Sequence, residues 1–263
     1  MAFPEIENEF RTTTRLLLGT ELKGIDDYGE WLGARVPLPY PSKSILSEKE
    51  VWLPPPLSFR NTCFTTKRVI SMEEMDKVNT SPFSPDNLKG ATMDSIVQKL
   101  LKPIAYVSGN VRYQEHKNVE KCSGAGDGIN LYYGEDLYLS IKNVAYSNYT
   151  LYCENMFGCH AVLHSKFCIH AYNSTNITRC FEVDGCANSS DLYFCHNCEG
   201  MSNAILCFNA KNLRYAVGNV EVGPNEFARV KKMLLEFIKN ELGSKKMIDL
   251  DIYKVGQVQS PRY

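Results

Sequence analysis

Cysteine recurs in one fixed frame through the second half of this chain. Eight of the ten cysteines fall between residues 153 and 207. Those that recur at a spacing of 27 residues are Cys153 with Cys180 and Cys207, Cys159 with Cys186, and Cys168 with Cys195. Self-similarity at a fixed period of this length is typical of repeat architectures. The chain is therefore expected to fold as a stack of similar units.

Other residue types keep the same frame. The matched pairs include Phe167 with Phe194, Gly158 with Gly185, and Asn176 with Asn203. Successive cysteines from Cys153 to Cys207 are separated by multiples of three residues, so each repeat divides into three segments of about nine residues. Each segment offers a few β-forming residues followed by Asn, Ser, Gly or Asp, which tolerate tight turns. This pattern favours a parallel β-helix.

In a parallel β-helix, equivalent residues of successive turns stack one strand spacing apart, about 4.8 Å. Small thiols can then form an inward column, and asparagine amides can bond to one another at the corners. A leucine-rich repeat has a comparable period, but the leucines are not maintained and no unit contains a helical half. We therefore predict an α+β or mainly β fold, built on a cysteine-rich parallel β-helix-like solenoid with about 27 residues per repeat.

The repeat divides the chain into three expected regions. Residues 1–115 are expected to form an extended, Pro-rich N-terminal arm with a loop and helices, serving as an assembly region. Residues 116–222 form the repeat solenoid, and residues 223–263 a capping helix followed by a C-terminal strand. Terminal repeats of a solenoid are atypical and need covering, which is the role expected of the last helix.

The first region contains several recognisable elements. An apolar pattern over residues 5–18, ended by Gly19, predicts a helix, and proline makes residues 36–59 an extended arm or loop. Ser71 with Glu74 forms a capping box for a short helix. Residues 92–101 predict a second helix capped by Thr92 and stopped by Pro103, followed by a strand over residues 104–113.

The last region is amphipathic. Residues 224–242 carry apolar residues on one helical face, and Gly243 is expected to end that helix. Residues 248–252 alternate apolar and acidic residues, which predicts one half-buried strand.

Composition narrows the functional classes. The 263-residue chain has a net charge of −1, so it lacks the excess of positive charge that is typical of nucleic-acid-binding proteins. It lacks an apolar run long enough to cross a bilayer and a signal-peptide pattern at its start, so we expect a cytoplasmic protein with reduced thiols. The sequons at Asn148, Asn173, Asn176 and Asn188 then follow from the Asn-rich turns.

Two kinds of thiol chemistry are conceivable. Cys195-His196-Asn197-Cys198 with His170 or His164 could offer tetrahedral zinc ligation, but no second close cysteine pair exists. A cysteine nucleophile beside His160 or another histidine needs only a base and an orienting group. No feature distinguishes one thiol from the others, so we interpret the cysteines as packing residues.

Acidic residues suggest a third kind of chemistry. Carbohydrate-active β-helices gather carboxylates along one groove for acid and base catalysis. The carboxylates available here are Glu154, Glu182, Asp184, Asp191 and Glu199, of which Glu182 and Asp184 would share a strand face. The Gly-rich segment 123–128 lacks the Lys-Ser/Thr of a phosphate loop and predicts a turn into the first repeat. Asp26, Asp27, Tyr28 and Trp31 predict either protein contacts, if they are exposed, or anchors for the arm, if they are buried.

The stretch from Asn143 to Asn219, through Cys180-Phe181-Glu182 and Tyr193-Phe194-Cys195, resembles cysteine-rich parallel β-helix-like repeat proteins of archaea and their viruses. This resemblance brings no activity and no catalytic motif. The arm, the long loop and the helix near residues 92–101 are also similar, more loosely, to subunits of tailed-virus-type shells.

These likenesses imply a non-enzymatic structural subunit of a symmetric assembly, most specifically a capsid protein of a virus or virus-like particle. It would form homo-oligomers through its arm and loops, with other shell proteins as further partners, without a membrane or a specific nucleic-acid site. It would reside in the virion after assembly in the host cytoplasm. We expect no catalytic, cofactor-binding or metal-binding residues. The alternatives are a β-helical carbohydrate-binding or carbohydrate-active protein and a zinc- or thiol-dependent cytosolic protein.

Overall fold

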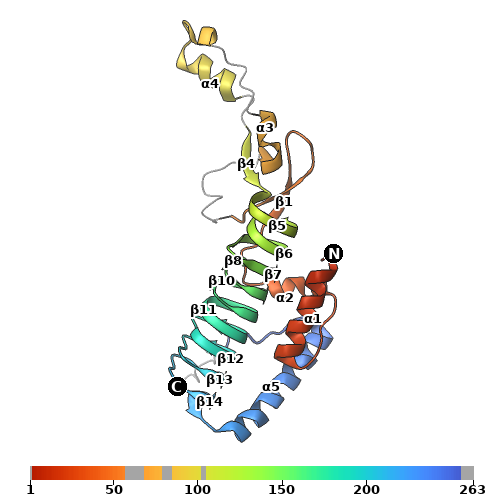
Figure 1. Cartoon of the computed structure of the whole chain (residues 1–263), viewed down its shortest axis with the longest axis vertical. Coiled ribbons are helices and arrows are strands. Elements are labelled where there is room, and N and C mark those ends of the chain that lie inside the picture. Colours follow the sequence, from red (N-terminus) through yellow and green to blue (C-terminus); the bar gives the residue numbers. More distant parts are fainter. Residues whose placement is uncertain (1, 57–67, 79–84, 102–104, 256–263) are drawn as a thin grey trace, which may run out of the picture.

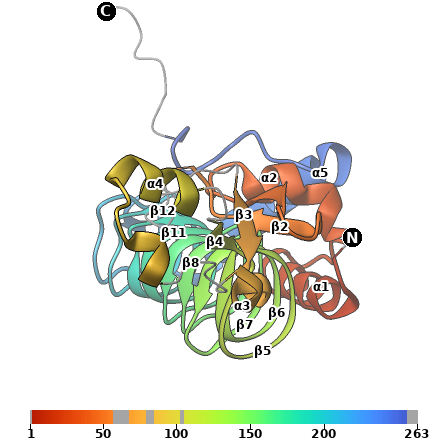
Figure 2. The same cartoon turned by 90° about the horizontal axis from the view of Figure 1, so that it is seen from above.

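A stack of short strands forms the body of the molecule (Figure 1). The computed structural model describes residues 2–56, 68–78, 85–101 and 105–255. Residues 111–217 form a β-solenoid of about nine turns, which confirms the predicted parallel β-helix. The arm lies beyond the first turn, and two helices run along one side (Figures 1 and 2).

The solenoid follows a three-residue rule. From Asn143 to Gly218 every third residue has a positive φ, with two extended residues between successive corners. Registered partners lie twelve residues apart from Lys142 onward, as in Cys168 with Met156. A turn of twelve residues with a corner at every third has four sides. Thirteen residues separate some earlier partners, such as Gly128 and Ile141.

The predicted 27-residue repeat is therefore wrong as the length of a turn. Twenty-seven residues equal two twelve-residue turns plus one three-residue side. Cys153, Cys180 and Cys207 consequently lie on three successive sides and do not stack. All four sides obey the same inward, outward and corner rule, so any spacing divisible by three matches equivalent environments.

The ladder is parallel throughout, except at its last pair. Its strands are β5 (Val111–Cys122), β6 (Gly124–Tyr138), β7 (Ile141–Ala145), β8 (Asn148–Leu151), β9 (Glu154–Phe157), β10 (His160–Leu163), β11 (Lys166–Asp184), β12 (Ala187–His196), β13 (Ser202–Ile205) and β14 (Arg214–Val217). The short β15 (Val220–Glu221) turns back antiparallel to β14. Next to it, the Asn219 side chain accepts a hydrogen bond from the Phe208 N–H and donates one to the Phe208 carbonyl, both at 2.8 Å.

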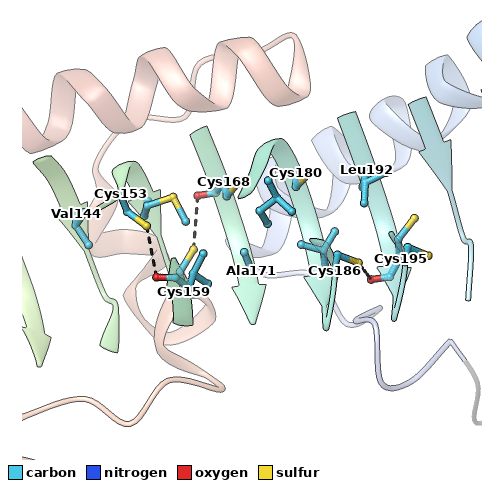
Figure 3. Packing of buried hydrophobic residues seen from close by; sticks show 14 of the residues in the cluster. Val144, Cys153, Cys159, Cys168, Ala171, Cys180, Cys186, Leu192 and Cys195 are labelled. Carbon is cyan, nitrogen blue, oxygen red and sulfur yellow. Dashed lines mark hydrogen bonds between the residues drawn. The ribbon is translucent and has the colours of Figure 1, made fainter. Parts of the chain in front are cut away.

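The inward residue of each side fills the solenoid. Figure 3 shows this column, in which Val144, Cys153, Cys168 and Ala171 point into the same interior. Several thiols donate to a carbonyl nine residues later, as Cys159 does to Cys168 at 3.7 Å. The hydroxyl groups of inward serines also form hydrogen bonds. The Ser147 hydroxyl, for example, donates to the Ala145 carbonyl and accepts a hydrogen bond from the Cys159 N–H.

The corners carry hydrogen-bonded ladders. The Asn118 amide donates to Asn130, which donates to Asn143 and that in turn to Asn155, at 2.9, 2.8 and 2.8 Å. Asparagine tolerates the left-handed conformation better than most residues do, and stacking satisfies its amide. The predicted asparagine pairing at corners is thus confirmed.

One outer face is apolar, and helices cover it. Its residues recur every twelve positions, and they include Ala145, Phe157, Ile169, Phe181 and Tyr193. Helix α1 (Pro4–Leu18) lies against this face, and its Phe10 ring meets Phe157 at 5.3 Å. Gly19 ends α1 in the left-handed conformation (φ 68°), as predicted.

The segment after α1 also belongs to this covering layer. It consists of η1 (Ile25–Tyr28) and α2 (Gly29–Gly33), which contribute buried Ile25, Trp31 and Leu32. The first 33 residues are therefore part of the body, in contrast to the expected arm, because their apolar stripe matches the apolar face of the solenoid.

The arm is built from short elements. It comprises the antiparallel hairpin β1 (Tyr40–Lys43) and β2 (Glu50–Leu53), β3 (Val69–Ser71), η2 (Met72–Glu74), α3 (Met75–Val78), η3 (Pro85–Leu88), α4 (Met93–Leu101) and β4 (Tyr106–Gly109). Ser71 and Glu74 form the expected capping box, and Thr92 Oγ1 accepts the Ser95 N–H at 3.2 Å. Pro103 and residues 57–59 lie outside the described residues, as does Cys63.

The C-terminal region differs from expectation in three ways. Helix α5 (Pro224–Lys245) passes through Gly243 and ends at Lys246, which adopts φ 61°. Its first turn meets the last solenoid turn through Phe227 and Tyr215, whereas Ile238 and Leu242 pack into the cluster that contains α1, so α5 caps the end only at its start. Residues 248–252 form no strand, although Ile248 and Ile252 are buried against that cluster.

Candidate functional site

The thiol column is an interior feature. Nine cysteines are described, and all are reduced and buried. Burial raises the pKa of Cys122 to about 12, that of Cys153 to about 11 and that of Cys159 to about 12. The hydrogen bond to Cys198, together with burial, also raises the pKa of Cys186. These four neutral thiols, without access to solvent, are poor nucleophiles. Hydrogen bonds from Cys186 and Cys195 lower the pKa of Cys198, and one from Cys195 lowers that of Cys207, although both thiols are buried in the column.

The Cys195–Cys198 segment does not gather a metal site. Cys195 and Cys198 point into the column, whereas His196 points outward and bonds through Nδ1 to Asp184 at 2.8 Å. His164 stacks on Tyr152 at 4.7 Å between ring centroids. Within the described part of the chain, no three His, Cys, Asp or Glu side chains are grouped to hold a metal. The two-residue spacing of this pair reflects two neighbouring inward positions.

Most of the candidate carboxylates are paired with a residue one turn away. Arg179 donates to Asp191 at 2.7 and 2.6 Å, and Lys211 donates to Glu199 at 2.7 Å. Glu154 lies between Lys142 and Lys166 at 3.8 and 3.2 Å. Each pair is separated by twelve residues, the length of one turn. Exposed ion pairs of this kind contribute little stability individually, but they leave these carboxylates engaged with neighbours.

Glu182 and Asp184 are buried and point into different environments. Glu182 is a corner residue that pairs with Nδ1 of His170, and its other oxygen accepts the Ile252 N–H at 3.3 Å. Asp184 accepts from Asn173 and pairs with His196, both at 2.8 Å. The two carboxylates do not form the exposed catalytic pair that the sequence suggested.

These pairs attach the C-terminal segment to the solenoid. Arg35 donates to Asp251 at 2.6 Å, and its guanidinium lies 4.4 Å from the Tyr253 ring centroid. The Trp31 ring meets the His170 ring at 4.4 Å. The cluster therefore holds three chain segments together.

The acidic and glycine-rich candidates near the first turns are also structural. The Asp26 carboxylate accepts from the Tyr146 hydroxyl at 2.7 Å and from the Ala2 N–H at 2.9 Å. Trp31 is buried, so the anchoring interpretation of this segment holds. Residues 123–128 enter strand β6, where a Cβ on Gly126 would lie 2.3 Å from the Tyr113 carbonyl oxygen.

The arm presents apolar side chains to solvent. Its own buried cluster is small and centres on Val51, Leu53 and Val69. Its exposed apolar residues are Ile45, Leu46, Met75, Leu88, Met93 and Val97. Met93 is 71% exposed and Val97, one turn later on α4, is 41% exposed. Of these exposed residues, Val97 and Met93 lie on the helix that the sequence predicted.

A tyrosine-lined hollow lies on the first turns of the solenoid and was not predicted. It encloses about 730 Å³ and is lined by Tyr113, Gln114, Asp136, Tyr138, Leu139, Tyr149 and Leu151. Tyr149 and Leu151 lie on the side of the solenoid opposite the apolar face that α1 covers. The lining residues come from three turns, so only a correct twelve- or thirteen-residue register would have brought them together.

Comparisons with known proteins add no relative. No protein-family model, no curated protein and no solved structure matches this chain. Among the described helices, none is both long and apolar enough to span a membrane.

Proposed function

We propose that this protein is a structural subunit of a symmetric assembly and that its arm binds neighbouring subunits. The most specific form of this proposal is a shell protein of a viral or virus-like particle. The observation that carries the proposal is the apolar stripe of the arm, which the described part of the chain leaves uncovered.

Burial energetics support a partner for this stripe. Exposed apolar patches mark interaction surfaces, and covering one releases about 25 cal/mol for each Å² removed from water. Met93 and Val97 lie one helical turn apart on α4, so a single partner surface can cover both. The arm lies beyond the first turn of the solenoid, where another chain can reach it (Figure 1).

The interior of the body supports a structural role as well. The candidate thiols fill the column, and the candidate carboxylates form pairs between turns. A rigid solenoid that uses these groups for packing is suited to bear load or to hold a fixed spacing in an assembly.

Light scattering coupled to size-exclusion chromatography, followed by electron microscopy, tests the proposal. We expect the full chain to form particles of defined size. The double variant Met93→Asp/Val97→Asp should abolish them while leaving the melting temperature of the body unchanged. Ile129→Asp is the matched control, because Ile129 is 44% exposed on the solenoid outside the arm. A monodisperse wild-type monomer would remove the proposal.

A further inference from the structure

The tyrosine-lined hollow presents a mainly apolar surface to solvent. Tyr113 and Tyr149 are 52% and 45% exposed, and the Tyr113 and Tyr138 rings lie 6.0 Å apart at an angle of 48°. The carboxylate of Asp136 is buried and already has an interaction partner, so it is not available to a ligand. Apart from Gln114, the remaining lining consists of tyrosine and leucine side chains. The hollow is therefore suited to an apolar occupant.

The occupant that the molecule itself offers is the α4 stripe, formed by Met93 and Val97. We propose that the α4 stripe of one copy docks in the tyrosine-lined hollow of a second copy. This inference rests on the proposed function, and it identifies the surface of the neighbouring subunit that the arm binds.

The side chains of the two surfaces match. Met93 and Val97 are four residues apart, which is the spacing of the anchors with which an amphipathic helix lies in a hydrophobic groove. A methionine thioether packs favourably against aromatic rings, and its flexible side chain adapts to an irregular surface. The hollow encloses about 730 Å³, which leaves room for both side chains. Because Asp136 is buried, the contact removes no exposed carboxylate from water.

The position of the arm suits a reciprocal contact. Strand β8 carries Tyr149 and Leu151, and α4 lies on the same side of the molecule as β8, away from α1 (Figures 1 and 2). The arm lies beyond the first turn, whereas the hollow is formed by the first turns themselves. A two-fold axis across the solenoid on this side places α4 of each copy beside the first turns of the other. Such a two-fold contact is self-complementary, and it is the commonest symmetry of protein oligomers.

The size of the two surfaces favours a second copy over a different partner. A stable interface engages about 20–30 residues on each side, whereas seven residues line the hollow. In the reciprocal contact each copy contributes its hollow and also its arm, which has six exposed apolar residues among those described. These residues can form the apolar centre of the interface, with polar neighbours at its rim. A partner that fills only the hollow gains about half of this contact.

Site-specific photocrosslinking tests the contact on the full-length chain. Val97 is replaced by the photoreactive residue p-benzoylphenylalanine, and ¹⁵N-labelled protein is mixed with unlabelled protein. Mass spectrometry then separates links between copies from links within one copy. We expect links between copies from position 97 to the segments that contain Tyr113 and residues 136–151. The same replacement at Met233, which is 57% exposed on α5, is the control and should not link to these segments.

A charge in the hollow provides a second test. Tyr149→Asp should raise the dissociation constant between subunits at least about tenfold, measured by mass photometry over a dilution series. Ile129→Asp is the matched control, since Ile129 is 44% exposed on the early turns but does not line the hollow. It should leave the dissociation constant unchanged. Melting curves confirm that each variant is folded.

The docking site and the role of the arm can fail separately. Particles that are lost in Met93→Asp/Val97→Asp but persist in Tyr149→Asp would overturn the docking site and leave the role of the arm intact. Links from position 97 to another surface of the neighbour alone would overturn it as well. A monodisperse wild-type monomer would overturn both proposals.

Discussion

The solenoid and the arm solve the problem of burial in opposite ways. The solenoid interior contains a continuous cluster of 24 fully or almost fully buried residues, whereas the buried cluster of the arm contains three among the residues that the structure describes there. Each solenoid turn covers the apolar residues of its neighbour, so packing accumulates along the stack. Among its described residues, the short elements of the arm bury few apolar side chains against one another. The difference shows that the solenoid packs mainly on itself, and it is the reason for proposing a partner for the arm.

The largest expected contrast comes from burying a charge in each region. Val183 is fully buried in the solenoid column, so Val183→Asp should cost at least about 4 kcal/mol and unfold the body. Val97→Asp in the arm should change the free energy of unfolding by less than about 0.5 kcal/mol. Urea denaturation measures both. Equal changes in the free energy of unfolding would contradict this contrast, because Val97 would then contribute as much to folding as Val183.

Alkali should act on the solenoid selectively. The pKa values of Cys122, Cys153 and Cys159 are raised from 9.0 to about 11–12, so the folded state favours the neutral thiols. Their contribution is complete below pH 9 and is lost progressively as the pH rises from 9 to the folded pKa values of about 11 to 12. Each thiol should cost about 1.4 kcal/mol per pH unit in that window. Urea midpoints from pH 8 to 11 test this, and a flat profile would contradict it.

The corner ladder should give an intermediate effect. Asn143→Ala removes the hydrogen bonds to Asn130 and Asn155 and places alanine at φ 55°, so we expect a loss of about 2–3 kcal/mol. Asn143→Gly removes the same bonds but accepts the corner conformation, and should recover about 1 kcal/mol. Thermal unfolding of the three proteins compares them. Identical losses would mean that the corner conformation carries no strain.

The smallest of these effects should be that of acid on the arm. Although burial opposes ionisation, hydrogen bonds from Ser47, Ser44 and Ser71 lower the pKa of Glu74 from 4.5 to about 2. A lowered folded pKa contributes stability above pH 4.5 that is lost as the pH falls toward 2. Hydrogen exchange in residues 69–78 should therefore accelerate at pH 3 relative to pH 6, after correction for intrinsic rates. Glu74→Gln should remove that difference, and exchange that accelerates equally in the variant would exclude Glu74 as the cause.

The sequence predicted the solenoid more completely than it predicted the turn length. Cysteines separated by multiples of three identified inward positions correctly, because every side places its first residue inside. Because all four sides place equivalent residues inside, the cysteine spacing did not reveal the length of a turn. Cys153 and Cys180, for example, are both inward residues but lie on different sides. Carboxylates at corners and outer positions looked available, but their partners were one unrecognised turn away. Only the register reveals such pairs as Arg179 with Asp191.

Local signals predicted helices well where a cap or an apolar stripe was present. Gly19 ended α1 and Thr92 capped α4, because both effects depend on neighbours within one turn. Gly243 did not end α5, since the packing of Leu242 continues that helix beyond it. The tyrosine-lined hollow could not be predicted, because Tyr113 and Tyr149 meet only through the irregular early turns.

The side chain of Asn219 has a consequence for how copies of this chain can grow into larger objects. The Asn219 side chain forms hydrogen bonds with the N–H and the carbonyl of Phe208, so another strand cannot pair with these two groups. This hinders the end-to-end stacking of solenoids into a fibre at this position. In the proposed assembly, contacts between copies are therefore expected on surfaces other than the peptide groups of Phe208.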